Sequence, residues 1–188
     1  MNTKVLVFGS SGLMLAIAAA SLGDPTQAQQ LQAQPLKVCS GTFALCTIAP
    51  CQPIPGNEKQ VLCHCTVNRG YSVGAEPCQG PQQIADKQLI HSRYYPVKSY
   101  AICNNDRPWA WCLDKPCIID TNNPEVAACT CDLAKNQGDY VIVTSNYTPA
   151  TCTTGVISSA TVQQIDQATA SLKKSRALPP FPIHILNK

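Results

Sequence analysis

The longest apolar run of the chain stands near its start. Val5 to Ala20 is apolar apart from two glycines and two serines, and one positive charge, Lys4, precedes it. The stretch that follows, Ser21 to Gln34, is polar and rich in glutamine. A short apolar run behind a positive charge is typical of a secretory signal peptide. This run is too short and too rich in glycine and alanine for a comfortable membrane span, so the pattern favours a cleaved signal over a retained transmembrane helix.

We predict that the signal peptide covers residues 1–28. Cleavage after Ala20 and cleavage after Ala28 each leave a small residue at the cut, and both sites stay open. A linker over residues 29–38 then leads to the first cysteine. Export through this signal predicts a secreted or periplasmic protein.

Shorter apolar runs after the signal indicate strands. Val61 to Val67 and Tyr71 to Val73 flank the sequence Asn68-Arg69-Gly70, in which glycine can adopt a positive φ. This arrangement predicts a β-hairpin that turns at Asn68-Arg69-Gly70. In the second half, Tyr140 to Thr144 is rich in β-branched residues and predicts the clearest strand of the protein.

A helical period appears near the C-terminus. Thr161 and Gln164 have the spacing of a capping box, and Pro179-Pro180 ends the pattern. We predict a helix over about residues 159–174, and its narrow apolar stripe favours a packing role over a partner-binding one. That stripe consists of Val162, Ile165, Thr169 and Leu172.

All twelve cysteines follow the predicted signal, and their spacing repeats. The inner four of the first half recur 66 residues later in the second half, with Cys46, Cys51, Cys63 and Cys65 matching Cys112, Cys117, Cys129 and Cys131. The outer ones match in the same order at offsets of 64 and 74 residues, Cys39 with Cys103 and Cys78 with Cys152. An even number of cysteines at this density, behind an export signal, predicts disulfides.

This repeat predicts a small, disulfide-rich α+β protein made of two tandem six-cysteine modules, over residues 39–100 and 103–188. Each module is expected to contain a β-hairpin and a short helical or irregular segment at its C-terminal end. Three bridges within each module is the simplest arrangement, although six cysteines allow 15 pairings. A weaker likeness beyond the last cysteines sets Gln82–Ile84 beside Gln163–Ile165.

Composition and charge narrow the range of partners. Charged residues make up only 13% of the chain, and its formal net charge is +3. Removal of residues 1–28 takes away one lysine and one aspartate and leaves that charge unchanged. Proteins that bind nucleic acid or anionic lipid usually carry clustered lysine and arginine, so neither partner is expected.

Candidate chemistry is sparse. Cys63-His64-Cys65 carries the ligand types that zinc and copper prefer, but the second copy has Thr130 in place of the histidine, and the export signal favours disulfides. His91 and His184 stand in no catalytic motif, and no Cys-x-x-Cys occurs. We therefore predict no cofactor, no metal and no enzymatic activity, and keep metal binding at residues 63–65 as an alternative.

Two features suggest binding. Trp109 and Trp111 fall on one side of a strand, where they form either an aromatic platform for a glycan or protein partner or a small packing core. Gln52 to Leu62 and Ile118 to Ala128 are polar, turn-rich stretches closed by cysteines, and constrained loops lose little entropy on docking. The sequence thus predicts a non-enzymatic exported protein with a partner-binding or cell-envelope role, with inhibition of an extracellular enzyme through one of these loops as the alternative.

Overall fold

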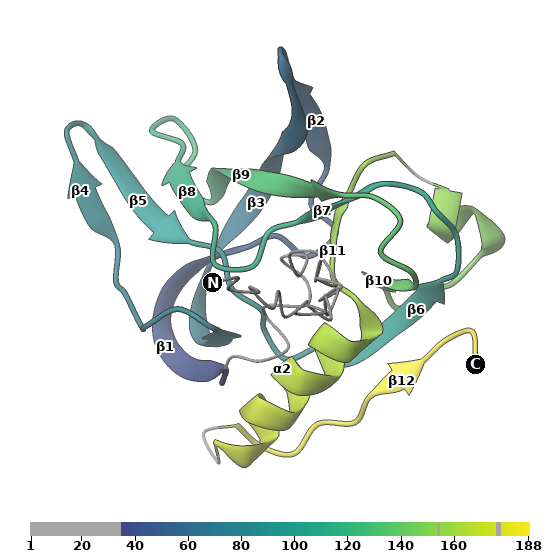
Figure 1. Cartoon of the computed structure of the whole chain (residues 1–188). Coiled ribbons are helices and arrows are strands. Elements are labelled where there is room, and N and C mark those ends of the chain that lie inside the picture. The colour runs from purple at the N-terminus through teal and green to yellow at the C-terminus, as the bar shows by residue number, and fades with distance from the viewer. Residues whose placement is uncertain (1–34, 154, 176–177) are drawn as a thin grey trace, which may run out of the picture.

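The computed structural model of the chain describes residues 35–153, 155–175 and 178–188 (Figure 1). The predicted signal peptide and most of the predicted linker lie outside these residues. Within them the protein is small, disulfide-rich and built mostly of strands, with one α-helix and six disulfides. In this part of the chain no helix has the length and apolar character that crossing a membrane requires.

The elements follow one another in this order: β1 Lys37–Leu45, β2 Cys51–Ile54, β3 Asn57–Gly74, β4 Gln82–Ile84, β5 Lys87–His91, β6 Ser99–Cys103, β7 Trp109–Trp111, β8 Pro116–Ile119, β9 Val126–Ala134, β10 Tyr140–Val143, the 3₁₀ helix η1 Pro149–Thr153, β11 Ser158–Ser159, α2 Val162–Lys174 and β12 His184–Ile185.

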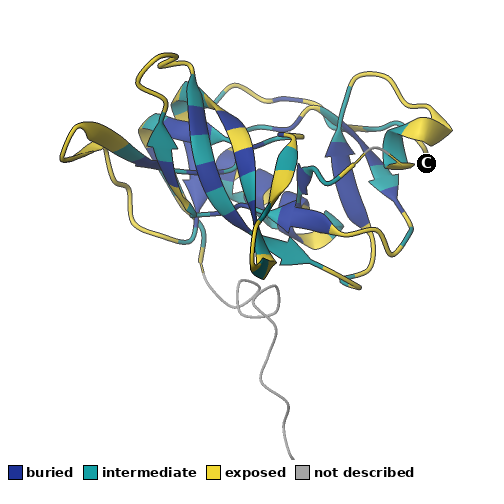
Figure 2. Ribbon diagram, turned by 90° about the horizontal axis from the view of Figure 1, so that it is seen from above, coloured by how far each residue is buried: buried dark blue, intermediate teal, exposed yellow. Residues whose placement is uncertain are grey.

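Two central strands, β3 and β9, join the halves of the chain into one sheet. They run antiparallel, and the strand order across the sheet is β1-β3-β9-β8-β5-β4. Strand β2 pairs with the start of β3, and β7 pairs with the end of β9. A smaller sheet, in the order β10-β6-β12, lies beside it (Figure 1). Figure 2 shows the buried residues gathered along the middle of the strands and the exposed ones at the hairpin tips.

Every disulfide joins two cysteines of the same half, and the pairing is nested in the same way in both halves. The first cysteine pairs with the sixth, the second with the fifth and the third with the fourth. The bridges are Cys39–Cys78, Cys46–Cys65 and Cys51–Cys63, then Cys103–Cys152, Cys112–Cys131 and Cys117–Cys129. No cysteine of the described ranges, which include all twelve, is free.

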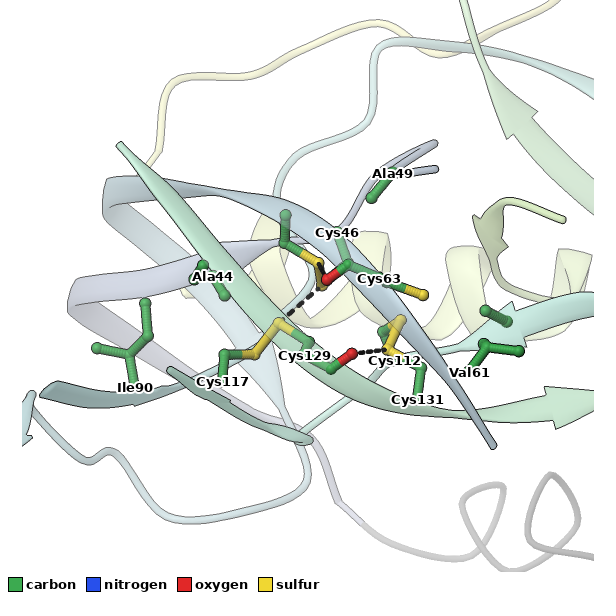
Figure 3. Close-up of a cluster of buried hydrophobic side chains, with 13 residues drawn as sticks. Ala44, Cys46, Ala49, Val61, Cys63, Ile90, Cys112, Cys117, Cys129 and Cys131 are labelled. Atoms are coloured by element: carbon green, nitrogen blue, oxygen red, sulfur yellow. Dashed lines mark hydrogen bonds between the residues drawn. A yellow bond between two sulfur atoms is a disulfide. The ribbon is translucent and has the colours of Figure 1, made fainter. Parts of the chain in front are cut away.

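The inner cysteines form the core of the large sheet. Cys51 lies opposite Cys63, Cys63 opposite Cys129, and Cys129 opposite Cys117, so four cysteines stand in a row across β2, β3, β9 and β8. Alternate residues of a strand face the same side, and Cys65 is therefore buried beside Cys63. Figure 3 shows these sulfurs packed with small apolar side chains from both halves.

The strand registers of the first half recur in the second. Ala44 lies opposite Val67 and Ala110 opposite Leu133, each shifted by 66 residues. The same shift relates Cys51 opposite Cys63 to Cys117 opposite Cys129. The ladders around the inner cysteines are therefore equivalent pair for pair.

In each half, a segment that comes after the inner cysteines crosses to the other half. His91, at the end of β5, pairs antiparallel with Pro116, and Ile157 forms the same bridge with Pro50. The next residues, Ser92 and Ser158, are both buried. The Ser92 Oγ accepts a hydrogen bond from the Lys115 N–H at 3.0 Å, and the Ser158 Oγ accepts one from the Ala49 N–H at 3.1 Å. Each half thus anchors its partner by a buried serine.

The predicted turn at Asn68-Arg69-Gly70 is wrong, because β3 continues without interruption from Asn57 to Gly74. Gly70 does take a positive φ, 132°, but it does so inside the ladder, opposite Gly41. Cross-strand pairing with β1 supplies the hydrogen bonds that a local turn would otherwise satisfy, so the long-range pairing overrides the turn signal. The hairpins of the sheet instead turn at residues 55–56, 85–86 and 120–125.

The helix and the strand expected in the second half are confirmed. Strand β10 covers all but the last residue of the predicted strand, and α2 begins at Val162 with Thr161 and Gln164 forming the capping box in both directions. The helix lies between β1 and β12 in Figure 1. Leu172, fully buried, packs with Val73 of β3 and with Phe181. The likeness of residues 82–84 to residues 163–165 is not structural, since the former form β4 and the latter belong to α2.

Leu172→Ala is expected to lower the free energy of unfolding by about 2–5 kcal/mol, because it opens a cavity between α2 and the sheet. Lys174→Ala, at the end of the same helix, is the control and is expected to change it by less than about 0.5 kcal/mol. Chemical denaturation of the oxidised protein measures both. Equal effects of the two substitutions would show that the helix does not rest on this contact.

Candidate functional site

A hairpin, formed by β2 and the start of β3, projects from the large sheet (Figure 1). The Cys51–Cys63 disulfide closes its base, with the two Cα atoms 4.1 Å apart. At the tip, Gly56 has a φ of 75°, and the Asn57 Oδ1 accepts hydrogen bonds from the N–H groups of Lys59 and Gln60 at 3.0 and 3.1 Å. The predicted eleven-residue loop is thus a strand pair with an exposed, internally bonded tip.

An open groove of about 760 Å³ runs beside this hairpin. Its apolar part consists of Ile54 and Val61 from the hairpin, Leu133 from the end of β9, and Val156. Its charged residues have opposite signs, with Glu58 and Lys135 among the lining residues. The groove is therefore lined by apolar and polar side chains and carries no excess of one charge.

Among the residues that the structure describes, no strand pairs with the outer edge of β2, and this leaves the groove open. The equivalent edge of β8 is covered by β5 over three consecutive residue pairs, from Leu89 with Ile118 to His91 with Pro116. On β2 the covering segment touches only the base, where Ile157 bridges Pro50 and the Cys51 N–H donates to the Val156 carbonyl at 3.0 Å. The rest of the β2 edge faces the groove.

Pro53 lies on this uncovered edge. The N–H and C=O groups of successive residues point to alternate edges of a strand. The backbone nitrogen of Pro53 therefore points to the same edge as that of Cys51, away from β3. A proline there sacrifices no hydrogen bond to β3 and removes one N–H from the open edge, as is common on edge strands. The edge offers carbonyl acceptors, and the side chains of the groove supply the remaining contact surface.

A second, smaller hollow of about 40 Å³ lies where the two halves meet. It is lined mainly by apolar side chains, including Leu113, Val141 and Ile165. Tyr94 also lines it, and burial raises the pKa of this phenol well above its ordinary value, so the ring stays neutral. Its volume suits no more than a few atoms of a ligand.

A buried ion pair fastens the end of β3 to the second half. The Arg93 Nη1 lies 3.1 Å from the Asp114 Oδ1, and both side chains are at most 10% exposed. The Asp114 Oδ2 also accepts a hydrogen bond from the Ala75 N–H at 2.7 Å. A Cβ at Gly74 would collide with both charged groups, so the close approach requires glycine there.

Desolvation dominates the titration of this pair. Burial raises the pKa of Asp114, against the opposing effects of the Ala75 N–H and Arg93, and burial also lowers the pKa of Arg93. Neither Arg93 nor Asp114 stands in a recognisable sequence motif, so no sequence pattern marks either as a candidate site residue.

The two tryptophans expected to bind or to pack differ in exposure, although Trp111 also packs against the cluster that contains Trp109. Trp109 is 2% exposed and stacks on Tyr140 with ring centroids 6.3 Å apart. Trp111 is half-buried, and the Lys115 Nζ lies 4.8 Å from its ring centre. A partner that approaches β7 would therefore meet Trp111, whereas Trp109 belongs to the packing beneath.

The cysteines of the metal-like string are oxidised. Cys63 and Cys65 each belong to a disulfide, and two close clusters of cysteine sulfurs in the described residues, one of which includes Cys65, also consist of bridged cysteines. Disulfide sulfur lacks the thiolate charge with which zinc and copper are bound. His64 is exposed, on the opposite face of β3 from both cysteines. Metal binding at this string would require two core disulfides to be reduced.

Comparisons with known proteins add no relative: no protein-family model, no curated protein and no solved structure matches the chain.

Asp114→Asn is expected to lower the free energy of unfolding by about 3 kcal/mol, because it leaves the buried Arg93 charge without a counter-charge. The double variant Arg93→Gln/Asp114→Asn should recover part of this loss. Asp132→Asn, which breaks the more exposed pair of Lys115 and Asp132, is the control and should cost less than about 1 kcal/mol. Denaturation of the oxidised proteins measures all three, and a double variant less stable than Asp114→Asn would contradict the pairing.

Proposed function

We propose that the chain is an exported, non-enzymatic binding protein whose groove beside β2 receives an extended, apolar segment of a partner protein. The observation that carries the proposal is the vacant outer edge of β2, next to a groove of about 760 Å³. Its counterpart, the outer edge of β8, is occupied by a strand of the chain itself.

The proposal includes a duplicated framework of two tandem modules, over residues 39–100 and 103–188. Its support is the 66-residue offset shared by the inner cysteines, their nested disulfides, the strand registers and the buried serines. When two copies of one module pair through β3 and β9, the resulting sheet has two equivalent edges, the outer edge of β2 and the outer edge of β8. The chain then covers one edge with β5 and most of the other remains open, so an antiparallel strand is the occupant that we propose for it.

Strand β5 supplies the pattern for that occupant. It runs antiparallel to β8 and sets Ile90, which is buried, against the inner sulfurs. Because Val156 already takes the place beside β2 that corresponds to Ile90, a partner segment would lie beyond Val156, run antiparallel to β2 and point apolar side chains at Ile54 and Leu133. The balanced charges of Glu58 and Lys135 favour a neutral segment over a strongly acidic or basic one.

Export supports this role and is itself part of the proposal. Six disulfides suit an oxidising space such as the periplasm or the extracellular medium, and the predicted signal peptide would direct the chain there. Alkylation of the protein purified from its native compartment is expected to leave its mass unchanged, and alkylation after reduction should modify all twelve cysteines. Free thiols before reduction would count against an oxidising compartment.

Ile54→Asp is expected to reduce capture of the partner at least tenfold, because it buries a charge where an apolar side chain docks. Ile84→Asp, at the exposed end of β4, is the matched control and should leave capture unchanged, since Ile84 is remote from the groove residues. The measurement is quantitative pull-down from culture supernatant or periplasm, followed by peptide mapping of the bound segment. Equal capture by both variants would exclude the groove.

Inhibition of an extracellular enzyme is the second candidate, favoured by the exposed tip of the same hairpin. A tip closed at its base by Cys51–Cys63 resists the unfolding that productive cleavage would require. In this case the wild-type protein should inhibit a secreted enzyme, and Lys59→Ala or a single cut at the tip should abolish inhibition while the fold persists. Inhibition that survives a cut tip would assign the activity elsewhere.

A further inference from the structure

The Cys39–Cys78 disulfide has one buried and one exposed end. Cys39 is 8% exposed, whereas Cys78 lies in the exposed stretch that follows β3. The other ten cysteines, all within the described ranges, are buried or half-buried. A thiol in solution therefore reaches Cys78 more readily than any other sulfur of the protein.

The buried end lies against a fixed positive charge. The Arg93 Nη2 donates a hydrogen bond to the Cys39 Sγ at 3.1 Å and another to the Lys37 carbonyl at 2.9 Å. The Arg93 Nη1 is held by the Asp114 Oδ1 at 3.1 Å and by the Glu76 carbonyl at 3.3 Å. The guanidinium is thus positioned at Cys39, and its partners on both sides prevent it from turning away.

Exposure and charge together define a direction for thiol–disulfide exchange. In such exchange a thiolate attacks one sulfur, and the other sulfur leaves with the bonding electron pair as a thiolate. A nearby cation stabilises that leaving thiolate and speeds its departure. The exposed Cys78 is suited to be attacked, and Cys39, beside Arg93, is suited to leave.

We propose that Cys39–Cys78 is a thiol-exchange site of this protein, at which an external dithiol forms a mixed disulfide with Cys78 and releases Cys39 as a thiolate held by Arg93. The second thiolate of the dithiol then attacks the dithiol sulfur that is bonded to Cys78, and Cys78 leaves as a thiolate. The dithiol becomes a disulfide, and the two electrons that it loses reduce the Cys39–Cys78 pair. With a monothiol such as glutathione the second step requires another glutathione molecule, which leaves with the first as glutathione disulfide, so the adduct on Cys78 forms first and can be trapped.

The remaining contacts keep such exchange local. The Asp114 Oδ2 still holds the Ala75 N–H at 2.7 Å, and the inner disulfides of the core stay closed. Residues 77–81, which link β3 to β4, are already exposed, so their release uncovers no part of the core. Exchange would therefore free this segment without unfolding the protein.

The second half contains a natural control. Cys103–Cys152 occupies the corresponding outer position, but Cys103 is fully buried and Cys152 is half-buried. The Cys152 carbonyl accepts hydrogen bonds from neutral groups, the Asn105 amide at 3.2 Å and the Tyr140 hydroxyl at 3.4 Å. The outer bridge of the second half is thus less accessible to a thiol in solution, and the groups that contact the Cys152 carbonyl are neutral.

The test exposes the oxidised protein, with all six disulfides intact, to reduced glutathione and separately to dithiothreitol. After an acid quench and alkylation, peptide mapping assigns each modified sulfur. Glutathione is expected on Cys78, and dithiothreitol should open Cys39–Cys78 about tenfold faster than Cys103–Cys152. A glutathione adduct on Cys39, or equal rates for the two bridges, would overturn the proposal.

Arg93→Gln distinguishes leaving-group stabilisation from a purely structural role of the arginine. A structural role predicts faster reduction in the variant, because loosening would expose Cys39. The proposal predicts the opposite, a rate for Cys39–Cys78 about five- to tenfold lower with the rate for Cys103–Cys152 unchanged. The double variant Arg93→Gln/Asp114→Asn, which leaves no unpaired charge, should be equally slow, and Asp114→Asn alone should stay fast. An unchanged or higher rate in both Arg93 variants would refute the assignment.

Discussion

The antiparallel pairing of β3 with β9, which sets Cys63 opposite Cys129, is the constraint on which the rest of the structure depends. It brings the two disulfide-closed hairpins into one sheet and aligns four cysteines across four strands. Because these sulfurs are buried together, they supply much of the apolar core that so small a protein otherwise lacks. The halves therefore share one core, and Ser92 and Ser158 anchor the segment of each half that crosses to the other.

The two halves of the chain differ at a few places on the surface, and these places carry its specific features. Strand β5 covers β8, whereas the corresponding edge of β2 opens on a groove. Arg93 and Asp114 form a buried pair, whereas the residues 66 positions away are Ser159 and the exposed Ile48. The Cys39 sulfur thus lies beside a fixed cation, whereas in the other outer disulfide Cys103 is fully buried and Cys152 half-buried. Both the proposed binding groove and the proposed exchange site arise from such differences, on a framework that the two halves have in common.

Local signals in the sequence predicted some elements well and others badly. The capping box at Thr161 and Gln164 located the start of α2 closely, because capping is decided by residues three positions apart. The β-branched run located β10 for a similar reason. The turn predicted at Asn68-Arg69-Gly70 is absent, because β1 pairs along the whole of that segment and keeps it extended. A turn signal is a weak preference, and a ladder of cross-strand hydrogen bonds outweighs it.

The sequence by itself determined the framework of sulfurs: its even count, its repeated spacing and the expectation that the cysteines form disulfides within each half. These follow from cysteine spacing and redox chemistry, which need no knowledge of distant contacts. Only the tertiary structure decided which of the 15 pairings each half adopts, that the halves share a sheet, that β2 keeps an open edge, and that Arg93 reaches Cys39. Those outcomes depend on which residues far apart in the chain become neighbours, and residue spacing along a sequence carries no record of that.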